Sequence, residues 1–397
     1  MQLNARAPGQ APDPARGKEA PGTAALGTTI LAAAFALPGL HTAAHAESAP
    51  EQGVISLKYV DYQDRQPGLE RTSVRSPSLS VLAPIAGVWA IEGSLVYDDV
   101  SGASPRYHTA VSGASRMEDE RTAADLKVTR YFPRGSASIG AAYSDENDYR
   151  SKAVSLQGSV SSEDKNTTAT FGAGVTNDTI DPVNLIVVGE RKRTVEWMAG
   201  VTQVLSPRDI VQLNFTHAAG RGYFSDPYKY VDNRPRERNQ RNVLLRWNHH
   251  VDGSGGTSRL AYRHYRDSFG IRAHTFSAEY VQPLSGGWIV TPSARVYSQS
   301  AAYFYFDPVY HGIFGPPFPP GYTFADPRPL SADQRLSAFG AHTFGVKVEK
   351  RLAADWSVDI KFERYEQRSS WRLFGSGSPG LQPLTARIVQ IGVSKRW

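Results

Sequence analysis

The sequence has no cysteine among its 397 residues and only three methionines. The lack of thiols excludes a disulfide scaffold, a thiolate metal centre and a cysteine nucleophile. No apolar run approaches the roughly 20 residues that a membrane-spanning helix needs, which excludes a helical membrane protein. Basic residues number 44 against 38 acidic ones and form no long run, so the charge pattern does not indicate nucleic-acid binding.

The N-terminal segment has the features of an export signal. Three basic residues precede an apolar stretch at 24–37, and Ala44-His45-Ala46 then provides the small residues of a cleavage site. This order predicts a cleaved secretory signal peptide at 1–46, with the mature domain at 47–397. The alternative is a buried N-terminal helix.

The mature chain alternates between apolar and polar side chains. In Trp356–Glu363 the even positions are apolar and the odd positions are polar or charged. Because a strand places successive side chains on opposite faces, the segment predicts a strand with one apolar and one polar face. The same period recurs near 89–97, 195–202, 211–216, 243–248 and 336–349.

Short and long connections separate these strands. The short ones are rich in turn residues and lie at 83–86, 132–135, 163–166, 206–209, 252–256, 284–287 and 352–355. The others, most of them longer, lie at 98–119, 177–191, 219–238, 303–334 and 367–383, with shorter ones near 64–70, 145–148 and 267–270. The pattern predicts an all-β, antiparallel up-and-down transmembrane barrel of about sixteen strands, with periplasmic turns and extracellular loops.

The soluble alternative is a β-sandwich or a propeller. A sandwich fits the alternation equally well, because its sheets also have one apolar face. Strand length, the export signal and the C-terminal residue favour the barrel. The chain ends on Trp397, preceded by apolar residues at alternate positions, which resembles the signal read by the barrel assembly machinery. We therefore expect an integral protein of the bacterial outer membrane, in contact with lipopolysaccharide.

The polar face of these strands predicts a charged lumen. Charges on the lipid side would cost about 2–4 kcal/mol each near the membrane centre, so they are expected to point inward. They form either a wall of cross-strand ion pairs or a selectivity ring on a transport path. The predicted lumen charges are Glu92, Asp125, Lys127, Glu196, Arg246, Arg259, Arg263, Glu279, Arg295, Lys347, Glu349, Asp359, Lys361 and Glu363.

Two loops and several acidic runs suggest binding at the outer rim. Loop 219–238 contains Arg234, Arg236 and Arg238, and Arg241 lies just after it. These four are candidates for binding lipopolysaccharide phosphates; the alternative is an ordinary solvated loop. The proline-rich loop 303–334 is predicted to be a plug or a lid. Acids recur at 98–99, 118–120, 145–148 and 178–181, but none has calcium-loop spacing, so no metal site is assigned.

Catalytic motifs are missing from the sequence. Neither a Gly-x-Ser-x-Gly elbow nor a His-Glu-x-x-His motif occurs. His264, Asp267 and Ser268 come nearest to a triad, and chance composition explains their spacing. We expect no enzyme activity, no catalytic residue and no cofactor.

Four segments carry a family resemblance: Asp99–Pro105, Ser225–Lys229, Tyr262–Ile271 and Ser331–Gly340. Together they resemble a family of proteobacterial secreted proteins of unknown function that are regarded as outer-membrane barrels. Genes of this family often lie near a small lipoprotein, a thioredoxin-like protein and a flavin transferase. The resemblance implies no catalytic residue, but it suggests a periplasmic or lipoprotein partner.

Two functions from different classes therefore remain open. The first is passage of a small solute or ion through the lumen. The second is a structural or docking role in an envelope redox or metal-handling system, with a plugged barrel.

Overall fold

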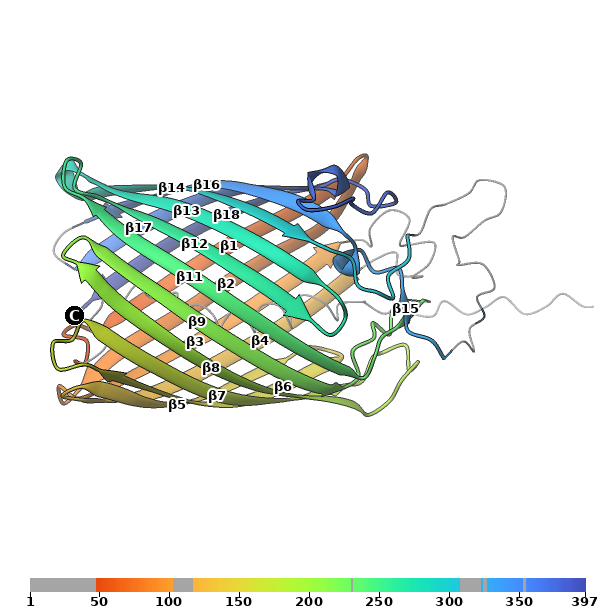
Figure 1. The fold of residues 1–397 in the computed structure, drawn as a ribbon, viewed down its shortest axis with the longest axis horizontal. Helices are drawn as coiled ribbons and strands as arrows, with labels where there is room; N and C mark the ends of the chain where they lie inside the picture. Colours follow the sequence, from red (N-terminus) through yellow and green to blue (C-terminus); the bar gives the residue numbers. More distant parts are fainter. Residues whose placement is uncertain (1–47, 103–116, 230, 308–322, 324–326, 353–354) are drawn as a thin grey trace, which may run out of the picture.

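The computed structural model describes residues 48–102, 117–229, 231–307, 323, 327–352 and 355–397 (Figure 1). The predicted signal peptide and parts of loops 98–119 and 303–334 lie outside these residues. Among the described residues, no helix is both long and apolar enough to cross a membrane.

Sixteen antiparallel strands form one closed barrel in up-and-down order (Figure 1). The strands are β1 (Val54–Gln66), β2 (Leu69–Ile85), β3 (Trp89–Gly102), β4 (Met117–Phe132), β5 (Gly135–Asp145), β6 (Tyr149–Ser161), β7 (Thr167–Ile180), β8 (Glu190–Ser206), β9 (Asp209–Gly222), β11 (Glu237–Val251), β12 (Gly256–Asp267), β13 (Arg272–Leu284), β14 (Trp288–Gln299), β16 (Phe339–Arg351), β17 (Trp356–Arg368) and β18 (Leu384–Arg396). A separate two-stranded ribbon, β10 (Asp232–Asn233) with β15 (Leu330–Ser331), joins two long loops.

The first and last strands close the barrel. β1 pairs with β18 from Val54 opposite Arg396 to Arg65 opposite Thr385. Backbone hydrogen bonds between Gly53 and Trp397 extend this seam, with N···O distances of 3.0 and 3.2 Å. The chain therefore ends at the short-turn end of the barrel, where the C-terminus is marked in Figure 1.

Local sequence explains the tight connections. At Pro67-Gly68, between β1 and β2, proline presets φ for the first turn position, and Gly68 adopts the positive φ of 71° that the second requires. Other connections are short because the strands continue further than the alternation indicated. The barrel strands are 11–17 residues long, which is more than the roughly ten that cross a bilayer.

The outer face is apolar and the inner face is polar. Leu57, Ile139, Leu156 and Phe171 are about 60% exposed on the outside, although no soluble protein would leave so many large apolar side chains unburied. Tryptophans 89, 247, 288 and 356 lie on this face near the short turns, at the level of a membrane interface. The architecture is that of a transmembrane barrel with periplasmic turns and extracellular loops.

Candidate functional site

The lumen wall carries all fourteen predicted charges on its inward face. Odd and even positions of a strand face opposite sides of the wall, and each of these charges belongs to the less exposed, inward-facing set. Each is next in sequence to an outward apolar residue, as Glu92 is to Ile91 and Lys361 is to Ile360. Seven of the fourteen are cationic and seven are anionic, so the set has no net charge.

Several of these charges form ion pairs along the wall. Glu92 and Lys127 are direct cross-strand partners with an O···N distance of 2.8 Å. Lys347 with Glu349, and Lys361 with Glu363, pair along single strands at 3.0 Å. The lysine side chains remain about one third exposed, so this part of the wall is solvated.

The cationic charges concentrate on one side of the barrel. Strands β11 to β14 contribute Arg246, Arg259, Arg263 and Arg295, opposed there only by Glu279 among the predicted set. Arg263 and Arg295 are exposed, and neither has an ion pair with any described residue. We call Arg246, Arg259, Arg263 and Arg295 the arginine strip. Since the fourteen predicted charges sum to zero, the strip makes their distribution around the lumen uneven.

Four buried ion pairs lie on the inner surface at the loop end, which we call the mouth. Strands β1, β3, β7 and β12 each carry an inward aspartate near their last residues, and a cation on the following or preceding strand pairs with it. The pairs are Asp64–Arg71 at 3.3 Å, Asp98–Arg121 at 2.7 Å, Asp178–Lys192 at 3.0 Å and Asp267–Arg238 at 2.6 Å. Sequence reasoning missed these pairs, although their signal is an aspartate at an inward position near the mouth end of four strands.

Remote loops pack together across part of the mouth. Phe269, from the β12–β13 turn, is fully buried and packs edge-on against Phe224 and Phe304, with ring centroids 6.0 and 5.0 Å apart. Ile271 and Leu336 complete this cluster. The described ends of loop 303–334 therefore belong to a packed mouth, while its middle, including the predicted proline-rich plug, lies outside the described residues.

A balanced ionic network lies beside this cluster. Arg234 binds Asp232 and Asp333 at 2.6 Å each, and Arg335 reaches Asp226 at 3.0 Å as well as Asp333. Lys229 adds a third cation, 3.4 Å from Asp226. Burial by itself would raise the pKa of Asp333, but the surrounding cations Arg335, Lys229 and Arg234 outweigh it and hold that pKa well below its usual value.

The four arginines predicted as a lipopolysaccharide rim do not share one surface. Arg234 lies in the buried network, Arg236 binds Glu190 at 2.5 Å, and Arg238 points inward to Asp267. Only Arg241 faces outward. It lies directly opposite Arg266 on β12, which in turn lies opposite Arg272 on β13.

We call Arg241, Arg266 and Arg272 the outer arginine row. All three are exposed on the lipid-facing side near the loop end, and none forms an ion pair with a described residue. Like charges directly opposite on adjacent strands destabilise a sheet. The row is therefore a surface whose electrostatics favour an anionic partner.

A second acidic cluster in the mouth lacks such balance. One carboxylate oxygen from each of Asp119, Glu146 and Asp148 lies within 4.8 Å of the others. Burial, reinforced by the charge of Asp119, raises the pKa of Glu146 to about 8. Burial also raises the pKa of Asp148 to about 6, although the nearby Tyr228 hydroxyl lowers it.

The residues that came nearest to a catalytic triad are not assembled as one. His264 faces outward, with its ring 5.1 Å from that of His274, whereas Asp267 points inward and binds Arg238. The Ser268 hydroxyl accepts a hydrogen bond from the backbone N–H of Asn239. These contacts separate the histidine from the carboxylate by the thickness of the sheet.

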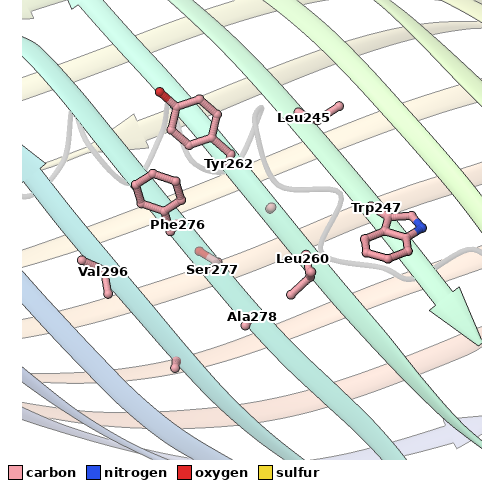
Figure 2. Close-up of a pocket in the computed structure, with 10 residues that line it drawn as sticks. Leu245, Trp247, Leu260, Tyr262, Phe276, Ser277, Ala278 and Val296 are labelled. Atoms are coloured by element: carbon pink, nitrogen blue, oxygen red, sulfur yellow. The ribbon is translucent and has the colours of Figure 1, made fainter. Parts of the chain in front are cut away.

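An apolar hollow of about 410 Å³ lies on the outer face of β11–β14 (Figure 2). Trp247, Tyr262 and Phe276 form its walls, and the small side chains of Ala278 and Ala294 leave the space between them. Its large side chains occupy the outward-facing positions of their strands, like the rest of the apolar surface. The hollow therefore faces lipid and is separate from the lumen.

The closed wall, apolar exterior and charged interior define the class as a transmembrane β-barrel. Within that class, the chain belongs to a family described as "Protein of unknown function (DUF3570)", whose model matches residues 111–188 and 185–386. The expected family resemblance is thus confirmed. No curated protein matches the chain.

Several solved structures are similar to this chain at low identity. The siderophore receptor PirA from Pseudomonas aeruginosa is 8% identical, with a TM-score of 0.42 over 88% of this chain and 80% of that one. A FadL homologue from the same organism is 11% identical, with a TM-score of 0.41 over 87% and 89%. The outer membrane protein opdK, also from P. aeruginosa, is 10% identical, with a TM-score of 0.41 over 87% and 100%.

Proposed function

We propose that the protein is a non-enzymatic outer-membrane barrel through which small polar solutes or ions pass, and that the arginine strip attracts those that carry an anionic group. The observation that supports this proposal is the pair of exposed lumen arginines, Arg263 and Arg295, which lack ion pairs with described residues. Cations exposed on a pore wall are the usual means of favouring anions.

Planar-bilayer conductance in a KCl gradient tests this function. Removing both charges by Arg263→Gln and Arg295→Gln is expected to move the reversal potential toward cation preference while conductance persists. Arg241→Gln, on the outer face, is the matched control and leaves the reversal potential unchanged. A wild-type protein that never conducts contradicts passage through the lumen.

The second candidate is a docking or structural role with a plugged barrel. Packing of Phe224, Phe269 and Phe304 across part of the mouth favours it, because loops held by a buried cluster obstruct passage. An envelope redox or metal-handling system, with a periplasmic or lipoprotein partner, would then be its context. Absence of conductance together with capture of one defined envelope partner would support this candidate.

Export and membrane contacts complete the proposal. Cleavage after Ala46 delivers the mature chain to the periplasm, and Trp397 on the terminal strand engages the barrel assembly machinery. The outer arginine row then binds lipopolysaccharide phosphates, because guanidinium groups bind phosphate oxygens in pairs. Arg266→Gln is expected to reduce thermal stabilisation by lipopolysaccharide, whereas Arg263→Gln on the same strand, facing the lumen, is not.

A further inference from the structure

The carboxylate cluster at the mouth end of β4, β5 and β6 differs from the other buried acids of the barrel. Asp119 lies near the start of β4, and Glu146 and Asp148 lie in the three-residue connection between β5 and β6. Their oxygens converge within 4.8 Å, although they come from two separate segments of the chain. The fold thus brings together three groups of the same charge.

Asp148 is the member of this cluster whose buried carboxylate has the fewest hydrogen bonds. Its side chain is only 4% exposed, and neither carboxylate oxygen accepts a hydrogen bond of normal geometry from a described residue. The one polar group that acts on it is the Tyr228 hydroxyl, which accepts from the N–H of Val183 and directs its own proton toward Asp148 without supplying a charge. Asp119 is also buried and accepts a single side-chain hydrogen bond, 2.9 Å long, from Asn147.

Charge counting distinguishes this cluster from the balanced network, which is close enough for the charge of Asp226 to act on Asp148. There, three aspartates face three cations, namely Lys229, Arg234 and Arg335. Here, Arg121 is the one cation that the described residues provide nearby, and its guanidinium is already bound to a fourth carboxylate, Asp98. When all four carboxylates are ionised, as they are around a bound cation, they outnumber the one guanidinium by three charges. Buried charge is costly unless it is paired or coordinates a metal.

We propose that Asp119, Glu146 and Asp148 bind a divalent cation of the calcium type. Ca²⁺ prefers carboxylate oxygens at about 2.3–2.6 Å, so two oxygens on one ion can lie up to about 5 Å apart, which accommodates the spacing of the cluster. The bound ion supplies the positive charge that arginines supply elsewhere in the mouth. It also links β4 to the β5–β6 connection and so fixes one edge of the mouth.

Thermal unfolding of the mature protein in detergent micelles tests the site. Adding CaCl₂ to protein prepared in chelator is expected to raise the midpoint by about 5 °C at a concentration of about 100 times Kd. Tb³⁺ offers a direct probe, because nearby tyrosines such as Tyr228 sensitise its luminescence, which excess Ca²⁺ then displaces.

Two variants and one control identify the residues responsible. Asp148→Asn keeps the shape of the side chain and removes its charge, so it is expected to lower Ca²⁺ affinity at least tenfold and to reduce the midpoint shift. Glu146→Gln provides the same test should Asp148→Asn fail to fold. Glu237→Gln, at an exposed outer position, retains the full response. An unchanged Ca²⁺ response in a folded variant, or no response in the wild type, overturns the proposal.

Discussion

In the barrel wall, every strand is hydrogen-bonded to the two strands beside it, whereas the mouth is assembled from side chains that are far apart in the sequence. On β17, Ile360 faces outward and Lys361 faces inward, because successive side chains of a strand lie on opposite faces. The neighbouring residues repeat that alternation. Phe224, Phe269 and Phe304 meet only because three connections converge. The comparison teaches that period-two patterning determines the wall, while the mouth depends on long-range packing.

The largest effect is expected for Asp333→Ala in the mouth. The variant leaves Arg234 and Arg335 without their shared carboxylate, and breaking a buried ion pair in this way costs about 3–5 kcal/mol. Because the mouth consists of loops, we expect it to open locally while the wall persists. Limited trypsin digestion should then show cleavage after Arg335, or after Arg236 in the loop that Arg234 holds; the Arg234–Pro235 bond itself resists trypsin.

The matched control for that experiment is Asp252→Ala. Asp252 pairs with Arg208 at an exposed periplasmic turn, where an ion pair contributes about 0–1 kcal/mol. Equal trypsin sensitivity of the two variants would show that the mouth is no more dependent on its buried charges than the turns are.

Ile360→Arg is the corresponding test of the wall. Ile360 is 49% exposed on the outer face, and an arginine near the membrane centre costs about 2–4 kcal/mol. Lys361→Ala, one residue on, removes a partly exposed ion pair with Glu363 on the solvated lumen wall and is expected to cost at most about 1 kcal/mol. Folding yield in liposomes measures both, and equal yields would contradict the face assignment.

A smaller effect is expected for Tyr297→Phe, where the wall meets the mouth. The Tyr297 hydroxyl donates to Gln299 at 2.6 Å, and the Gln299 amide donates in turn to the carbonyl of Ser337. Losing one such bond costs about 0.5–1.5 kcal/mol. Urea unfolding in micelles measures this loss, with Tyr59→Phe on the exposed outer face as the control. If Tyr59→Phe lowered the free energy of unfolding more than Tyr297→Phe does, the Tyr297–Gln299 hydrogen bond would not be the stabilising contact.

The topology of the two ends can be tested with almost no change in stability. An epitope tag after Ser254, in the β11–β12 turn, is expected to be inaccessible to antibody on intact cells and accessible once the outer membrane is opened. A tag after Leu185, which is 73% exposed in the β7–β8 loop, should be accessible on intact cells. The reverse labelling pattern would mean that the mouth faces the periplasm and the short turns face the cell exterior.

Much of the wall could be predicted from sequence because its rule is local. The alternation predicted about sixteen strands, the turn residues marked most connections, and the fourteen lumen charges have inward parity. Strand lengths were underestimated, since several strands continue into segments expected to be loops, as β3 does to Gly102 and β9 to Gly222.

The mouth was predicted poorly because proximity in sequence does not imply a shared surface there. Arg234, Arg236, Arg238 and Arg241 are neighbours in the chain, yet they reach a buried network, Glu190, an inward aspartate and the outer face. The outer arginine row shows the converse, since it collects one residue from each of three strands. Only the strand register could bring these residues together.

By itself, then, the amino-acid sequence determined that the chain forms a barrel and which side chains face lipid, because a strand's two faces are fixed by odd and even position. The tertiary structure alone decided which charges are neutralised. Asp226, Asp232 and Asp333 meet three cations, while Asp119, Glu146 and Asp148 meet mainly one another. The physical reason is that charge balance depends on distances across strands and loops, which no local pattern encodes.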